Sequence, residues 1–191
     1  MRCVEPPDID LDATAGDPFF IRGVAANLKR ESVEDTLDAI HGHLRDTLKI
    51  ESAWKHRSRR RLTSQQMLLH LEAWGCSAHA QIACHLARAC GIPAILVKTL
   101  DLKWIEHDNQ GDGRGSGHVY VEILAEGRPA LWDAQGGRLQ RRYAPDSMFV
   151  AVGQRVIYDK GGPDTVVLSH HGEEWEEQTR RLFPGPTRPS K

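Results

Sequence analysis

The chain has 191 residues, of which 40% are apolar and 27% charged, and its formal net charge is −1. This balance is typical of a globular domain. Because the net charge is close to zero, no overall electrostatic attraction to nucleic acid or to an anionic membrane is expected. No apolar run is long enough to span a bilayer, and the first residues lack the apolar core of a signal peptide. We therefore expect a cytoplasmic protein whose four cysteines are free thiols.

Two segments of different character open the chain. Residues 1–24 carry two adjacent prolines, several aspartates and little periodicity, so an irregular N-terminal arm is predicted. Residues 33–48 form the first clear helix, because apolar side chains recur there at steps of three and four. Ser32 is a suitable N-cap for this helix.

Two further helices flank a glycine–cysteine pair. Thr63 and Gln66 have the spacing of a capping box, and the short helix that they open is expected to end at Gly75. The next helix is predicted to begin at or just after Cys76, to bury an apolar face and to end at Gly91.

The hydrophobic pattern then changes to that of strands. Strands are predicted at residues 94–100, 118–124 and 130–133, with a turn at Glu126-Gly127 between the last two. Three further short strands are predicted at residues 149–152, 155–158 and 165–168, a last helix at 173–182 and a disordered tail at 183–191. Helices followed by an antiparallel sheet indicate an α+β domain.

Three residues have the chemistry and the order of a nucleophile, a base and an orienting acid. Cys76 lies at a helix start, where exposed N–H groups and the helix dipole favour a thiolate. A thiol nucleophile needs a base, and the base needs an orienting partner. His118 opens one strand and Asp133 closes the next. Counting from the turn, residue 118 falls opposite roughly 134–136, so His118 and Asp133 share the edge of the sheet where Cys76 is expected to dock.

These segments resemble the core of the transglutaminase-like superfamily, which is related to papain. The resemblance covers roughly residues 63–140 and rests on Gly75-Cys76, Gly91-Ile92-Pro93-Ala94, His118-Val119-Tyr120-Val121-Glu122-Ile123 and Leu131-Trp132-Asp133. It implies a papain/transglutaminase-like α+β fold, with the nucleophile at a helix N-terminus packed on an antiparallel sheet. It also implies one catalytic domain over residues 25–182, with Cys76 as nucleophile, His118 as general acid and base, and Asp133 as orienter.

The chain departs from the family pattern at three places. Trp74 stands where a glycine is common, Tyr120 stands where the strand usually carries tryptophan, and the residue after Asp133 is alanine instead of proline. The sequence Asp133-Ala134-Gln135-Gly136-Gly137 is reminiscent of papain-like toxins and protein-glutamine deamidases.

The resemblance implies a thiol-dependent hydrolase of amide bonds, a peptidase or amidase that acts on a protein or peptide through a thioester and needs no cofactor. A protein-glutamine deamidase or a transglutaminase, toxin-like or effector-like, is the main alternative. An arylamine-type acyltransferase shares the order of the three residues but fits the local motifs less well. A non-catalytic binding module on the same fold is the alternative from another class.

Several further residues are candidates for supporting roles at such a site. The backbone N–H of Cys76 is a natural oxyanion donor at a helix start. The candidates for a second donor or a substrate contact are Trp54, Gln65, Gln66, Trp74 and Gln135. His79, one helical turn after Cys76, is a rival base. Cys84 and Cys90 are expected to fill the core.

Two polar segments have simpler interpretations. The basic run that contains Lys55, Arg57, Arg59, Arg60 and Arg61 is expected to be a solvated loop, with an anionic partner such as RNA as the alternative. Residues 106–117 are expected to form a loop beside the active-site cleft. The histidines show no pair of pairs at the spacing of a zinc site, so no metal is predicted.

Overall fold

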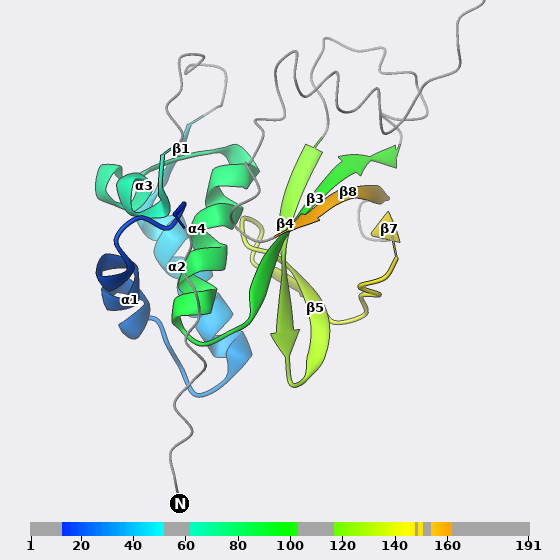
Figure 1. Ribbon diagram of the computed structural model, residues 1–191, viewed down its shortest axis with the longest axis horizontal. Helices are drawn as coiled ribbons and strands as arrows, with labels where there is room; N and C mark the ends of the chain where they lie inside the picture. Colours follow the sequence, from blue (N-terminus) through cyan, green and yellow to red (C-terminus); the bar gives the residue numbers. More distant parts are fainter. Residues whose placement is uncertain (1–12, 52–61, 103–116, 148, 151–153, 162–191) are drawn as a thin grey trace, which may run out of the picture.

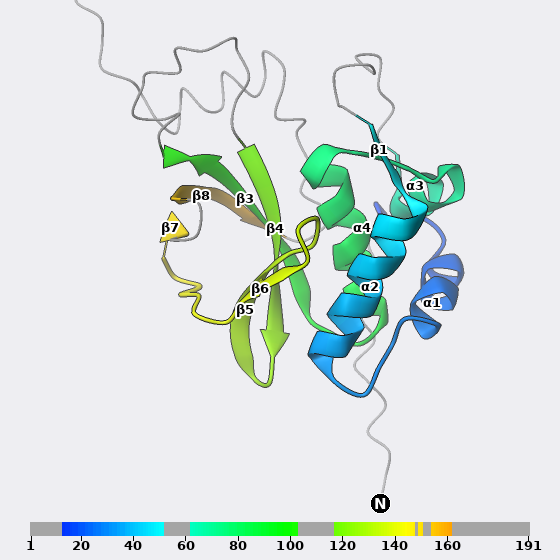
Figure 2. The ribbon, with the colours of Figure 1, turned by 180° about the vertical axis from the view of Figure 1, so that it is seen from behind.

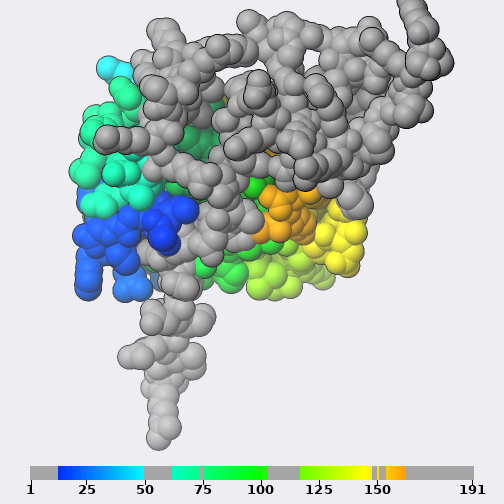
Figure 3. Space-filling model, turned by 45° about the horizontal axis from the view of Figure 1, so that its top comes forward, coloured from blue at the N-terminus to red at the C-terminus, as the bar shows by residue number. Residues whose placement is uncertain are grey.

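Helices and sheet occupy separate halves of the computed structural model, which describes residues 13–51, 62–102, 117–147, 149–150 and 154–161. Four helices lie on one side and a curved six-stranded sheet on the other (Figure 1). In the space-filling view, α1 and α3 lie at the opposite end of the visible face from β7 and β8 (Figure 3). The α+β prediction is confirmed.

Helix α2 (Val33–Thr47) forms where the apolar period predicts it. Ser32 accepts a hydrogen bond from the N–H of Asp35 and so caps the first turn. Leu37, Ile40 and Leu44 are buried along one stripe of the helix. The stripe faces the core because residues at these steps share one side of a helix.

The predicted arm over residues 1–24 is wrong from residue 18 onward, where helix α1 (Pro18–Ala26) forms. Asp17 accepts from the N–H of Phe19 at 2.9 Å and caps the helix. Pro18 occupies the first turn, where its missing N–H costs nothing. Ile21 is fully buried, so the packing of its side chain against the rest of the domain stabilises this short helix.

Helix α3 (Ser64–His70) has the predicted capping box, with both hydrogen bonds between Thr63 and Gln66 present. It ends earlier than predicted, because Leu71 adopts a left-handed conformation with φ 56°. The next residues form strand β2 (Glu72–Trp74), which pairs in parallel with β1 (Lys49–Glu51). Gly75, expected to end α3, instead opens α4.

Helix α4 (Gly75–Ala89) is the central helix and packs against the other three helices and against the sheet (Figures 1 and 2). Gly91 terminates it, as predicted. The N–H of Gly91 bonds the carbonyl of Arg88, and the N–H of Ile92 bonds that of Ala87 at 3.0 Å. This is a Schellman motif, and Gly91 supplies its left-handed residue with φ 91°.

The sheet has the strand order β6-β5-β4-β3-β8-β7, and its pairs are antiparallel. The strands are β3 (Ala94–Asp101), β4 (Gly117–Ala125), β5 (Arg128–Asp133), β6 (Arg138–Gln140), β7 (Phe149–Val150) and β8 (Arg155–Gly161). Glu126 and Gly127 both have positive φ, as a two-residue hairpin turn requires. Leu124 pairs with Pro129, so the predicted register is confirmed.

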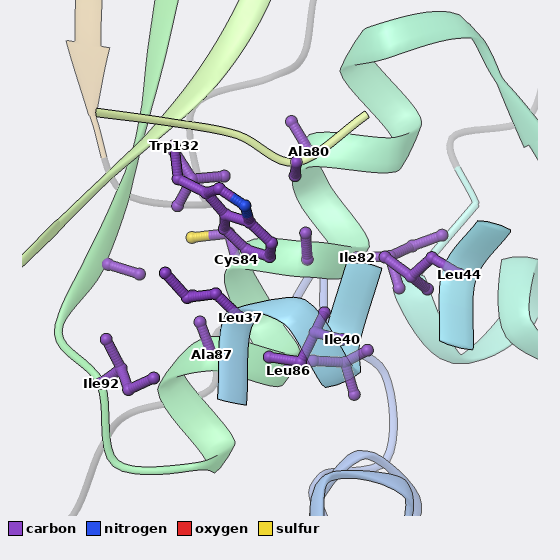
Figure 4. Packing of buried hydrophobic residues seen from close by; sticks show 14 of the residues in the cluster. Leu37, Ile40, Leu44, Ala80, Ile82, Cys84, Leu86, Ala87, Ile92 and Trp132 are labelled. Carbon is purple, nitrogen blue, oxygen red and sulfur yellow. The ribbon is translucent and has the colours of Figure 1, made fainter. Parts of the chain in front are cut away.

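The main core lies between the sheet and helices α2 and α4. Trp132 of β5 reaches into it beside Cys84 and Leu37 (Figure 4). Cys84 and Cys90 are buried and fill this core, as predicted. A smaller cluster covers the other face of the sheet; its buried members are Val97, Tyr120, Leu131, Val150 and Ile157.

Of the helices in the described ranges, none combines the length and hydrophobicity needed to cross a bilayer. The predicted strand at residues 165–168, the helix at 173–182 and the tail at 183–191 lie outside the described residues.

Candidate active site

Cys76 lies in the first turn of α4. Gly75 precedes it with φ 68°, a left-handed conformation that favours glycine and turns the chain sharply into the helix. N–H groups in a first helical turn have no intrahelical partner, and with the helix dipole they stabilise a nearby negative charge. Cys76 is partly exposed, whereas Cys84 and Cys90 are buried. The cysteine at the helix start is therefore the most accessible of the described thiols.

His118 and Asp133 meet at one end of two neighbouring strands of the sheet. The register of β4 and β5, continued by one residue pair, places Asp133 opposite Tyr120, and His118 follows two residues along on the same face. Nε2 of His118 lies 3.1 Å from Oδ1 of Asp133. A carboxylate oxygen accepts, so Nε2 donates. This leaves Nδ1 for the side chain of Cys76, with which His118 also interacts.

A tight turn after β5 holds the carboxylate of Asp133. The backbone N–H of Gly136 donates to Oδ1 at 3.0 Å. A Cβ atom on Gly136 would stand 2.8 Å from Oδ2, closer than real Cβ contacts allow. Glycine at this position therefore permits the close approach that makes the hydrogen bond.

The charges of these groups reinforce one another. Burial opposes the charged ring of His118, but its hydrogen bonds with Asp133 and Cys76, and the charges of both groups, raise its pKa to about 9. Burial favours a neutral carboxyl at Asp133, but the hydrogen bonds from His118 and Gly136 hold its pKa below the ordinary value. The arrangement therefore favours an imidazolium between two anionic groups.

Tyr120 packs behind the imidazole of His118. Their ring centroids are 4.6 Å apart and nearly perpendicular, and Tyr120 is buried. Burial raises the pKa of Tyr120, Arg155 partly counters this, and the nearby charges of Asp133 and Cys76 add to the rise. Tyr120 is thus neutral at ordinary pH, and its ring packs against that of His118.

His79, the rival base, has a different environment. Its side chain is 1% exposed, and neither ring nitrogen has a hydrogen-bond partner in the described part of the chain. Burial, and the proximity of His41, lower the pKa of His79 to about 4. A neutral imidazole sealed in this way is poorly placed to exchange protons with a substrate, so the geometry favours His118.

The candidates for a second oxyanion donor are not brought together at Cys76 by any described contact. Oε1 of Gln65 accepts from the N–H of Asp17, and Oε1 of Gln66 accepts from that of Thr63. Gln135 contributes its backbone N–H to Asp133. Trp54 and the side chain of Trp74 lie outside what the structure describes. A role for these five side chains at the site stays a prediction.

Other predicted features also fall outside the described ranges. They are the basic residues Lys55, Arg57, Arg59, Arg60 and Arg61, and the loop up to residue 116. Within the described ranges, no three His, Cys, Asp or Glu side chains are arranged to hold a metal ion.

The sequence patterns did not predict that His41 of α2 contacts the turn after Asp133. Its Nδ1 lies 2.9 Å from the carbonyl oxygen of Ala134, directly after Asp133. The glycines at 136 and 137 were the available signal of a close backbone approach, but they do not show which helix approaches.

Comparisons with known proteins agree with this arrangement. The model of the transglutaminase-like superfamily matches residues 21–133. No curated protein matches the chain. A Cytophaga hutchinsonii crystal structure described as a "Putative Cysteine Protease" is similar in fold, with a TM-score of 0.56 and 17% identity. The match covers 85% of this chain and 52% of that one, so the present chain spans about half the length of its structural neighbour.

Proposed function

Because the chain belongs to the transglutaminase-like superfamily, whose model matches more than half of it, we propose that it is a thiol-dependent hydrolase of amide bonds. Membership in this superfamily supports a cysteine-type enzyme in general. The proposal adds the residues and the reaction: Cys76 is the nucleophile, His118 the general acid and base, and Asp133 the group that orients His118. A protein or peptide is the proposed substrate.

The observation that carries the proposal is the double engagement of His118. Nε2 is 3.1 Å from Oδ1 of Asp133, and the same ring interacts with Cys76. An imidazole held in this way can take the thiol proton and keep it close to the reacting atoms. The raised pKa of His118, about 9, favours the state in which His118 holds that proton.

The proposed reaction has two steps. In the first, the thiolate of Cys76 attacks the amide carbonyl, and His118 gives its proton to the departing amine, which leaves a thioester. In the second, water attacks the thioester while His118 accepts a proton from it, which releases the carboxylic acid and restores the thiolate–imidazolium pair. The N–H groups at the start of α4 are the proposed stabilisers of the negative oxygen in both steps.

The first test is the rate at which iodoacetamide alkylates Cys76 as a function of pH. A Cys3→Ser background removes the cysteine that the structure does not describe, and the buried Cys84 and Cys90 should react slowly. We expect a rate midpoint below about 8.5, the ordinary cysteine pKa, that rises in His118→Ala. A midpoint near the ordinary value in both proteins would remove the support for a catalytic role and favour a binding module.

The second test separates peptide-bond hydrolysis from side-chain deamidation and from transamidation. Peptides that contain glutamine are incubated with the protein and analysed by mass spectrometry, with Cys76→Ser as the inactive control. New peptide ends indicate a peptidase, ammonia release with an intact backbone indicates a deamidase, and adducts with an added amine indicate a transglutaminase. The proposed peptidase should give new peptide ends, with water as the acyl acceptor.

A further inference from the structure

We propose that His41 is a positioning residue for the active site: it holds the turn that follows Asp133 and thereby fixes the carboxylate that orients His118. The inference rests on the roles proposed above for Cys76, His118 and Asp133. His41 lies on α2, far from these residues in the sequence, and its described contacts are with the turn after Asp133.

The first contact is a hydrogen bond to the residue after Asp133. Nδ1 of His41 lies 2.9 Å from the carbonyl oxygen of Ala134, which is completely buried. A carbonyl oxygen accepts, so Nδ1 donates. A buried carbonyl without a hydrogen-bond partner is destabilising, so this bond restricts where Ala134 can lie.

The second contact lies at the other end of the same turn. A Cβ atom on Gly137 would stand 2.7 Å from both Cδ2 and Nε2 of His41. The backbone of Gly137 therefore passes close against the imidazole ring, in a left-handed conformation with φ 64°. One ring thus supports the turn at residue 134 by a hydrogen bond and at residue 137 by packing.

The turn passes this constraint to the proposed catalytic groups. Between its two ends, the N–H of Gly136 donates to Oδ1 of Asp133 at 3.0 Å, and the same Oδ1 lies 3.1 Å from Nε2 of His118. A shift of the turn would change both distances together. Because catalytic geometry is sensitive to displacements of less than 1 Å, a support of this kind has a direct effect on reactivity.

His79 does not duplicate this support. The Ala134 carbonyl lies near enough to His79 to favour its protonation slightly, but neither ring nitrogen makes a hydrogen bond of acceptable geometry within the described residues. His79 is a buried neutral ring near the turn, while His41 makes the directional contact.

The experiment compares His41→Asn with His41→Leu. The two side chains have nearly the same shape, but asparagine keeps an N–H donor close to the position of Nδ1 and leucine has none. His43→Ala is the control, since residues two apart on a helix face different sides. Each variant is assessed by the pH dependence of Cys76 alkylation and by the NMR signal of the His118 Nε2 proton.

We expect His41→Leu to lower the alkylation rate constant at pH 7 by about tenfold, by analogy with the loss of activity when a group that orients a metal ligand is removed. It should also weaken the Nε2 proton signal. His41→Asn should retain more of both properties than His41→Leu, because asparagine keeps the donor to Ala134 and loses only the packing of the ring on Gly137. His43→Ala should leave both properties unchanged.

Two outcomes would overturn the inference. One is a His41→Leu variant that folds and keeps both the wild-type alkylation profile and the Nε2 signal. The other is equal loss in the asparagine and leucine variants, because the hydrogen bond from His41 to Ala134 would then contribute nothing to the position of the turn. Failure of the proposed function looks different, because the wild-type thiol would then show no His118-dependent midpoint.

Discussion

Nε2 of His118 and Oδ1 of Asp133 lie 3.1 Å apart, although fourteen residues separate them in the chain. The hairpin that connects them pairs residues 121–125 with residues 128–132. Their meeting depends on a two-residue turn with positive φ at both positions. A slip of one residue in this register would move Asp133 to the other face of the sheet. The hairpin register is therefore a condition for the proposed chemistry.

Asp133→Asn should lower the pKa of His118 from about 9, because burial of the ring then acts without the opposing carboxylate. The proposed hydrolase activity should fall by at least about 100-fold, as expected when the orienting acid is lost. The pKa is measured by NMR titration of the His118 ring. Asp146→Asn, at an exposed position, is the matched control and should change neither quantity.

Stability should fall as the pH rises through about 9. The pKa of His118 is higher in the folded protein than its ordinary value of 6.5, so its contribution is fully present below pH 6.5 and is lost toward pH 9. Urea unfolding between pH 6 and pH 10 measures this slope. The slope should flatten in His118→Gln, and an unchanged slope in that variant would contradict the assignment.

His79 should produce the opposite dependence at acid pH. Its folded-state pKa of about 4 lies below its ordinary value of 6.5, so the unfolded state binds more protons and stability falls as the pH drops between those values. The loss is on the order of 3 kcal/mol, at about 1.4 kcal/mol per pKa unit. Urea unfolding at pH 7, 5.5 and 4.5 tests this, and His79→Leu should show a shallower decline than the wild type.

Gly136→Ala should disturb the proposed site more than the fold. The added Cβ would stand 2.8 Å from Oδ2 of Asp133, so the carboxylate or the turn must move. We expect slower Cys76 alkylation at neutral pH and a weaker Nε2 proton signal from His118.

Gly42→Ala is the control for that substitution. Gly42 lies within α2 and has open space around an added Cβ, so alanine should stabilise the protein by about 1 kcal/mol. Cys76 reactivity should not change. Equal effects of the two substitutions on alkylation would argue against a specific role for the turn at residue 136.

Local sequence determined the features that depend on a few adjacent residues. The caps at Ser32 and Thr63, the Schellman motif at Gly91 and the hairpin turn at Glu126-Gly127 are each formed by groups within one turn of the chain. The hairpin register followed from that turn by counting, and it placed His118 and Asp133 together. Asp17-Pro18 is a local helix-start signal of the same kind, but the prediction of an irregular N-terminal arm did not take it into account.

Tertiary structure decided what depends on segments far apart in the chain. The early end of α3 accompanies pairing of β2 with β1, and the N–H of Lys49 bonds the carbonyl of Leu71 across that junction. Whether His41 meets Ala134 depends on how α2 packs beside the sheet, which no local pattern specifies. The order and chemistry of Cys76, His118 and Asp133 were thus readable from the sequence. The support behind Asp133 arises only when the helices and the sheet pack together, because a hydrogen bond depends on distance in space and not on distance along the chain.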